Sequence, residues 1–236
     1  GTDTGTGEIT DDDTAVVQSI TPATAEEGMS LTHTVTMSTA SATPETYPFT
    51  VAGVSATDNV DYSTMPTFSN GVTYNSTTGE ITVPAGVTTF TVTFPSTEDV
   101  LDETDETYTL TIGTISATGT ITDDDTSTIA VNDATIEEGG ILAFTVSLST
   151  PSATDVVFTP SFTDVTTAMG DYSTTTITYS VDGGTNYTTW AGGAITIPAG
   201  VTSVLFNVPS VEDLLDENTE TFTLTVTSPT AGTDTG

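Results

Sequence analysis

Bulky and small polar residues alternate along most of the chain. In the segments 31–37, 142–148 and 222–226 every second residue is bulky, and the residues between are mostly threonine or other small residues. A period of two is typical of a strand with one buried face, because successive side chains of a strand point to opposite sides. These short segments are separated by turns rich in Gly, Pro, Asn and Asp, without a helical stretch. The pattern predicts an all-β protein of the β-sandwich type.

Five sequence blocks occur twice, in the same order, and the second member of each pair lies 110 to 114 positions after the first. The pairs are 9–14 with 121–126, 26–28 with 137–139, 61–62 with 171–172, 84–87 with 198–201, and 98–103 with 212–217. Such self-similarity predicts tandem copies of one domain. We expect a first domain at 14–125 and a second at 126–236, with 1–13 as the closing strand and Asp triplet of a preceding repeat.

The charge of the chain is one-sided. It has 33 Asp and Glu, no Lys or Arg, and a formal net charge of −33. Its carboxylates must spread apart in water or be neutralised by bound cations. Binding to nucleic acid is excluded, because nothing can displace its counterions, and so is attraction to anionic membrane surfaces. No apolar run is long enough for direct membrane insertion. Without Cys, disulfides and thiolate metal sites are excluded as well.

The acidic residues are clustered, which points to a metal. Three Asp stand together at 123–125 with no basic neighbour, and further acids fill 98–103 and 212–217. Ca²⁺ takes six to eight oxygen ligands at about 2.3–2.6 Å, mostly from carboxylates and carbonyls on loops. The clusters therefore predict Ca²⁺ binding. The alternative is that they are solvated linker charges that aid solubility.

The repeated blocks resemble the Calx-β family, whose pattern is an early Glu-Gly, a later Asp-Tyr, a Pro-Ala-Gly turn, an acidic block and a closing Asp triplet. The resemblance covers nearly the whole chain. It implies two tandem Calx-β-like, immunoglobulin-like β-sandwiches of seven strands each, with calcium held by loops at one end. Bacterial members form arrays in giant secreted surface adhesins of the repeats-in-toxin type.

The resemblance also implies the calcium ligands. In the first copy they would be Glu26, Glu98, Asp99, Glu103, Asp123, Asp124 and Asp125, and in the second copy Glu137, Asp164, Glu212, Asp213 and Glu217. Two positions depart from the pattern. Gly53 stands where the second copy has Asp164, and the second copy reaches Gly236 before any closing Asp triplet.

The function that follows is structural. We expect calcium-rigidified extender repeats of an adhesin, extracellular on a bacterial cell surface, with neighbouring repeats of the same long protein as partners. The alternative is an adhesin domain that recognises a glycan or protein through Trp190 and its hairpin. An ice-binding surface is disfavoured, because the Thr-x-Thr runs are short and interrupted by acids.

We do not expect an enzyme. The one histidine, His33, matches Phe144 at a position predicted to face the core, and its replacement by Phe should be tolerated. The paired acids Glu98 and Asp102 could suggest glycosidase chemistry, but both copies carry them among other acids, and metal ligation explains them better.

The two ends of the chain carry the same five residues, Gly-Thr-Asp-Thr-Gly. We therefore expect residues 6–13 to add as a strand to the second copy of a neighbouring molecule, head to tail. In that arrangement Asp11, Asp12 and Asp13 would complete the calcium site of the second copy.

Overall fold

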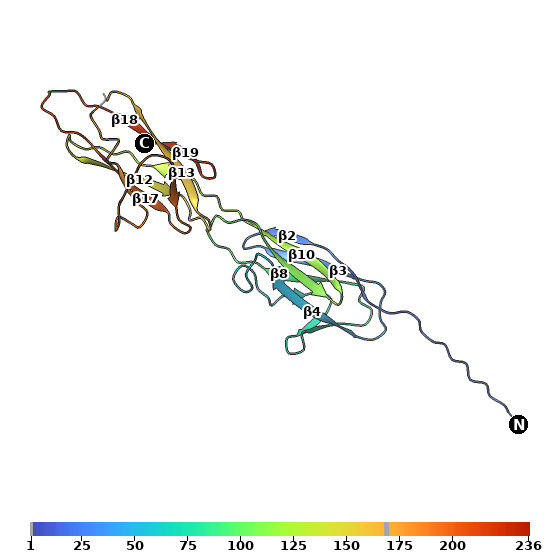
Figure 1. Cartoon of the computed structure of the whole chain (residues 1–236). Helices are drawn as coiled ribbons and strands as arrows, with labels where there is room; N and C mark the ends of the chain where they lie inside the picture. Colours follow the sequence, from blue (N-terminus) through green and yellow to red (C-terminus); the bar gives the residue numbers. More distant parts are fainter. Residues whose placement is uncertain (1, 168–169) are drawn as a thin grey trace. The chain divides into compact units, whose positions relative to one another are not determined.

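The computed structural model describes residues 2–167 and 170–236. Within these residues the chain forms strands β1 to β19 and no helix (Figure 1), so the predicted all-β class is confirmed. None of the described residues forms a helix long and apolar enough to cross a membrane. The strands fall into two compact units. The first runs to Asp99 and includes Thr104–Asp123, and the second consists of Val100–Glu103 and Asp124–Gly236.

The first unit is built from two sheets, with the strand orders β1-β3-β8-β5 and β2-β10-β9-β4-β7-β6. The strands are β1 (Val17–Ile20), β2 (Ala23–Glu26), β3 (Ser30–Met37), β4 (Glu45–Gly53), β5 (Thr67–Phe68), β6 (Thr73–Asn75), β7 (Glu80–Val83), β8 (Thr89–Pro95), β9 (Glu106–Ile112) and β10 (Ile115–Thr122). Neighbouring strands are antiparallel except β2 and β10, which run parallel.

The core of the first unit comes from the predicted alternation. β3 buries every second residue from Leu31 to Met37, and β8 and β9 bury Phe94 and Leu110 in the same way. The residues between them are mostly threonines that face water or are half-buried. The inner faces of the two sheets therefore share one hydrophobic core, as in a sandwich.

The second unit repeats this design, with the strand orders β11-β12-β17-β14-β15 and β16-β13-β18-β19. Its strands are β11 (Ile129–Val131), β12 (Ile141–Leu148), β13 (Val156–Asp164), β14 (Thr178–Ser180), β15 (Thr188–Thr189), β16 (Ile195–Ile197), β17 (Ser203–Pro209), β18 (Phe222–Ser228) and β19 (Gly232–Thr235). β11, β12, β17 and β14 correspond to β1, β3, β8 and β5. Two tandem immunoglobulin-like sandwiches are thus confirmed, and each contains short strands beyond the seven expected.

The two units differ at their last strand. β10 pairs with β9 and, through Gly119–Thr122, also with β2. In the second unit Gly236 pairs with Leu224, as Ala117 pairs with Leu110 in the first. Residues 132–137, all described, match the β2 region but form no strand.

His33 occupies a core position, as predicted, and is fully buried. Its Nδ1 lies 2.8 Å from the carbonyl oxygen of Thr21 and its Nε2 lies 3.0 Å from the hydroxyl of Tyr108. A carbonyl only accepts, so Nδ1–H donates to Thr21 and Nε2 accepts from the Tyr108 hydroxyl. Burial lowers the pKa of His33, which keeps the ring neutral. The expectation that Phe is tolerated here overlooked these two partners, and we now expect His33→Phe to destabilise the protein.

Candidate metal centre

Four chain segments meet at one end of the first unit. The Gly28 amide donates to the Thr97 carbonyl (3.2 Å), and the Thr97 amide donates to the Asp61 carbonyl (2.8 Å). The Glu27 amide donates to the Thr122 carbonyl (3.1 Å) at the end of β10. The turn after β2, the loop before Tyr62, the segment after β8 and the end of β10 are thereby held together. Each of the four carries acidic residues.

Glu98, a predicted ligand, packs against the turn after β2. Gly28 has φ +68°, and a Cβ built on it would lie 2.4 Å from the Glu98 Oε2. The second unit repeats this contact, because a Cβ on Gly139 would lie 3.0 Å from the Glu212 Oε2. Two features of this turn require glycine. The backbone is left-handed, and the carboxylate occupies the space that a Cβ would need.

The structure buries the second glutamate of the Glu-Glu-Gly block instead of the first. Glu26 is exposed, whereas Glu27 is only 8% exposed. Ala23 and Ala25 lie on the inward face of β2, and the period of two places Glu27 on the same face. The same count applied to the sequence could have found Glu27. Its counterpart in the second unit, Glu138, is exposed, as is the predicted ligand Glu137.

Asp164, at the end of β13, is paired with Phe222, and Gly53 is paired with Tyr108 at the same place in the first unit. The predicted match of Gly53 to Asp164 therefore agrees with the register of the two sheets. Asp164 accepts a hydrogen bond from the Tyr172 hydroxyl at 2.8 Å. Burial, followed by this bond, raises the pKa of Tyr172 to about 12.

Asp58 takes the place of this carboxylate in the first unit. The hydroxyl of Tyr62, which matches Tyr172, donates to Asp58 Oδ1, and the Gly53 amide donates to the same oxygen at 2.8 Å. A Cβ on Gly53 would lie 1.8 Å from the Ala56 carbonyl oxygen, so residue 53 has no room for a side chain. In the first unit the carboxylate that accepts from the tyrosine belongs to the loop after β4, whereas in the second unit it belongs to the end of β13. Matching the two copies by sequence does not reveal Asp58, because no residue of the second copy is aligned with it.

The second unit gathers several acids around Glu217 and Glu220. Desolvation raises the pKa of Glu217, and the neighbouring charges of Asp213, Asp171 and Glu138 add to this rise. A hydrogen bond with the Asp171 side chain is the main cause that raises the pKa of Glu220 to about 7. The repulsion of Glu217 and Glu138 contributes to the same shift. Carboxylates that raise one another's pKa bind protons readily, and they bind divalent cations for the same electrostatic reason.

The remaining predicted ligands fall into different places. Asp123 ends the first unit, where its amide lies 3.4 Å from the Asp105 Oδ1, an acid that the sequence analysis did not select. Asp99 is exposed at the edge of the same unit. Glu103, Asp124 and Asp125 belong to the second unit. In that unit Asp102 accepts a hydrogen bond from the Ser127 amide at 2.9 Å, which fixes the segment that carries Glu103.

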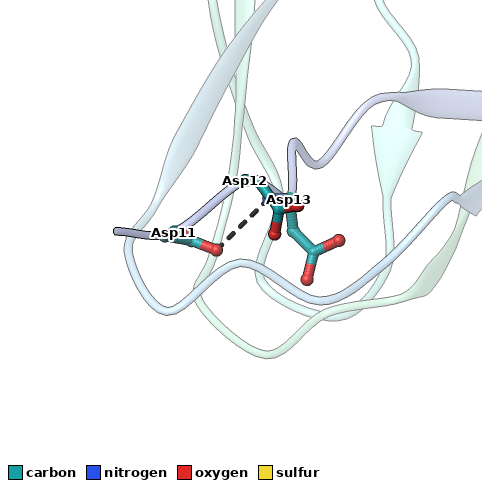
Figure 2. Close-up of side chains that lie close together, drawn as sticks. All are labelled: Asp11, Asp12 and Asp13. Carbon is teal, nitrogen blue, oxygen red and sulfur yellow. Dashed lines mark hydrogen bonds between the residues drawn. The ribbon is translucent and has the colours of Figure 1, made fainter. Parts of the chain in front are cut away.

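The N-terminal triplet Asp11, Asp12 and Asp13 is exposed on a segment without regular secondary structure (Figure 2). One carboxylate oxygen of each residue lies within 4.8 Å of the others, and the Asp13 amide donates to the Asp11 Oδ1 at 3.2 Å. This spacing allows the three side chains to share one cation. Ca²⁺ takes six to eight oxygens, so its remaining ligands would be water molecules or oxygens of another segment.

No family model matches the chain, and no curated protein matches its sequence. Solved structures that can be superposed on this chain include CBD12 from CALX1.2, with 15% identity and a TM-score of 0.36 over 88% of this chain and 76% of that one. The calcium binding domain CBD12 of CALX1.1 has 15% identity and a TM-score of 0.36, over 89% of this chain and 79% of that one. A structure of titin A168–169 has 11% identity and a TM-score of 0.31, over 94% of each chain. At these TM-scores the three structures carry no argument about the chemistry of this chain.

Proposed function

We propose that the chain is a calcium-binding structural module. The observation that carries this proposal is the acidic cluster around Glu217 and Glu220, together with the corresponding loops of the first unit. A sequence without Lys or Arg offers no protein cation to neutralise these acids. Ca²⁺ suits them because it accepts many carboxylate and carbonyl oxygens in flexible loop geometry.

The residues that would hold calcium lie on loops at the end of each sandwich. In the first unit we assign Glu27, Asp58, Asp61 and Glu98 beside the predicted Asp123. In the second unit we assign Glu138, Asp171, Glu212, Asp213, Glu217 and Glu220. When bound, the ion supplies the positive charge that these loops lack, and the side chains orient the loops around it.

The finer role we propose is that of an extender repeat in a secreted adhesin on a bacterial cell surface. The tandem repeat, the threonine-rich strand faces and the absence of cysteine from the sequence support this role. Calcium would make the repeats rigid, and neighbouring repeats of the same long protein would be the partners.

A ligand-binding role through Trp190 receives no support from its geometry. The indole packs against Phe162 and Phe206, with ring centroids 5.9 and 5.8 Å away. Its Nε1–H donates to the Gly193 carbonyl at 3.0 Å. Trp190 therefore acts as a packing residue of its hairpin.

Glu98→Gln is the variant that tests the calcium assignment in the first unit. Calorimetric titration with CaCl₂ should show weaker binding. The change removes the Glu98 carboxylate, which lies against Gly28, and leaves the shape of the side chain unchanged. Glu80→Gln is the matched control, since Glu80 pairs with Pro48 in the middle of β4, outside the loops. Equal calcium binding by both variants and the parent chain would contradict the assignment of Glu98.

A further inference from the structure

Each unit has a tyrosine whose hydroxyl holds an aspartate. In the first unit the Tyr62 hydroxyl donates to Asp58 Oδ1, and in the second the Tyr172 hydroxyl donates to Asp164 Oδ1 at 2.8 Å. The two tyrosines belong to the same repeated block, but the two aspartates do not match in sequence. Asp58 lies in the loop after β4, whereas Asp164 is the last residue of β13. Both units therefore place a carboxylate at this hydroxyl, although the chain supplies it from different positions.

The core fixes the ring of each tyrosine. Tyr62 is fully buried and stacks on Tyr108, with ring centroids 4.5 Å apart and an angle of 17° between the ring planes. Tyr172 stacks on Phe222 in the same way, at 4.2 Å and 23°. A ring that is stacked inside a close-packed core has few alternative positions. The core therefore sets where the hydroxyl lies, and with it the aspartate that the hydroxyl holds.

The backbone of each tyrosine is tied to another acidic segment. Tyr62 forms an antiparallel bridge with Ser96, and Tyr172 forms one with Ser210. A glutamate that we assign to the calcium site stands two positions after each of these serines. Each tyrosine therefore joins two segments of the candidate site, one through its hydroxyl and the other through its main chain.

The hydrogen bonds to each aspartate converge on one oxygen. Asp58 Oδ1 also accepts from the Gly53 amide at 2.8 Å, and Asp164 Oδ1 also accepts from the Thr167 hydroxyl at 3.1 Å. Within the described residues, Oδ2 of neither aspartate accepts a hydrogen bond, and both side chains are exposed. The tyrosine and its companion donor thus hold the carboxylate by Oδ1, and Oδ2 keeps its lone pairs for a cation.

We propose that Tyr62 and Tyr172 are positioning residues of the calcium sites, each of which holds its aspartate so that Oδ2 binds the ion. Asp164 then joins the ligands of the second unit, in the part that Asp58 plays in the first. A carboxylate that is already held by two donors loses little freedom when the ion binds, which favours affinity. This inference rests on the proposed function, because it assigns a role within the same calcium sites.

Tyr62→Phe and Tyr172→Phe, each in the 236-residue chain, test the proposal. NMR titrations with CaCl₂ follow the amide signals of both units in one sample, so each unit is the internal reference for the other. Loss of a hydrogen bond to a metal ligand typically weakens metal binding about 10–100-fold. We expect this loss in the first unit alone for Tyr62→Phe, and in the second unit alone for Tyr172→Phe.

Tyr47→Phe is the matched control for the first unit. The Tyr47 hydroxyl donates to the Ala15 carbonyl at 2.8 Å, and Tyr47 lies near the start of β4, whereas Gly53 ends that strand. This variant removes a hydroxyl and its hydrogen bond away from the acidic loops. It should bind calcium as tightly as the parent chain.

Asp58→Asn separates calcium binding from a purely structural role of the aspartate. The amide oxygen of asparagine can still accept from Tyr62 and Gly53, so stability in EDTA should stay close to that of the parent chain. Calcium binding by the first unit should weaken, because the charge is lost. Adding Tyr62→Phe to Asp58→Asn should then weaken calcium binding no further, since the tyrosine acts through the aspartate.

Parent-like calcium affinity in both tyrosine variants, or an equal loss in both units, would overturn the inference and leave the proposed function standing. Lower stability in EDTA with unchanged calcium affinity would also overturn it, because that result marks a structural role. Each variant tests its own unit, so one that fails to fold leaves the other decisive. A parent chain that binds no calcium would contradict the proposed function itself, and this inference with it.

Discussion

The buried pair of His33 and Tyr108 gives the sharpest prediction from the packing of the first unit. Both side chains are fully buried, and the hydroxyl of Tyr108 donates to Nε2 of His33 at 3.0 Å. The matching pair in the second unit is Phe144 and Phe222, whose ring centroids lie 6.0 Å apart. His33 and Tyr108 lie 5.7 Å apart by the same measure. The two units thus hold a polar pair and an apolar pair in the same place.

His33→Phe leaves the Tyr108 hydroxyl without its acceptor, and Tyr108→Phe leaves the ring nitrogen of His33 without its donor. A buried polar group that loses its partner lowers the free energy of unfolding by about 1–3 kcal/mol. In the double variant this hydrogen bond is lost as a whole, and the pair becomes the one that the second unit already holds. Its destabilisation should therefore be smaller than the sum of the two single effects, with a coupling of about 1–3 kcal/mol.

Chemical denaturation followed by circular dichroism measures these changes. The single tryptophan lies in the second unit, so its fluorescence provides an internal control whose transition should not move. Additive effects in the double variant would refute the reasoning. An NMR pH series would also refute it if the His33 ring titrated near its ordinary pKa. The signal is easily assigned, because His33 is the one histidine of the chain.

Two further predictions concern the loops. Gly53→Ala should lower the free energy of unfolding of the first unit by about 1–3 kcal/mol or more, since the new Cβ would meet the Ala56 carbonyl. Gly5→Ala, in open space, is the control, and equal stability of the two variants in denaturant would contradict the geometry. In EDTA the second unit should lose stability as the pH rises from 4.5 to about 7. The raised pKa values of Glu217 and Glu220 mean that its folded form binds protons more tightly than its unfolded form in that window. The lowered pKa of His33 acts in the opposite direction on the first unit, whose stability should fall as the pH drops below 6.5. A melting temperature of the second unit that rises with pH, followed by Trp190 fluorescence, would refute the first of these two directions.

Much of the fold could be predicted from the sequence, because alternation and repetition are local signals. The alternation at Leu31 to Met37 predicts the buried face of β3, and the repeated blocks predict two copies of one sandwich. The parallel pairing of β2 with β10 could not be predicted, since it joins Ala23 to Gly119 through the tertiary fold. The grouping of Val100–Glu103 with the second unit also depends on contacts that sequence matching does not contain.

The candidate site shows the same division. The resemblance of the repeated blocks to the family pattern implies Glu98 and Glu212 as ligands, and each lies against a glycine of the Glu-Glu-Gly block. Glu27 was missed although the alternation on β2 could have indicated it. Asp58 was missed because it lies in a loop of the first copy, whereas the matching carboxylate of the second copy, Asp164, lies at the end of a strand. An alignment of the two copies does not pair these residues. Glu220 was missed because its raised pKa depends on Asp171, which lies far away in the sequence.

The central claim is that the clustered carboxylates bind calcium in the folded state. A thermal melt of the chain in CaCl₂ and in EDTA at neutral pH tests it most directly, with circular dichroism for both units and Trp190 fluorescence for the second. Because the unfolded chain offers only dispersed carboxylates, one site at a hundredfold excess of free calcium over its Kd should stabilise the folded state by about 2.7 kcal/mol. We predict a higher melting temperature in calcium for both units. Identical melting temperatures in CaCl₂ and in EDTA would contradict the claim.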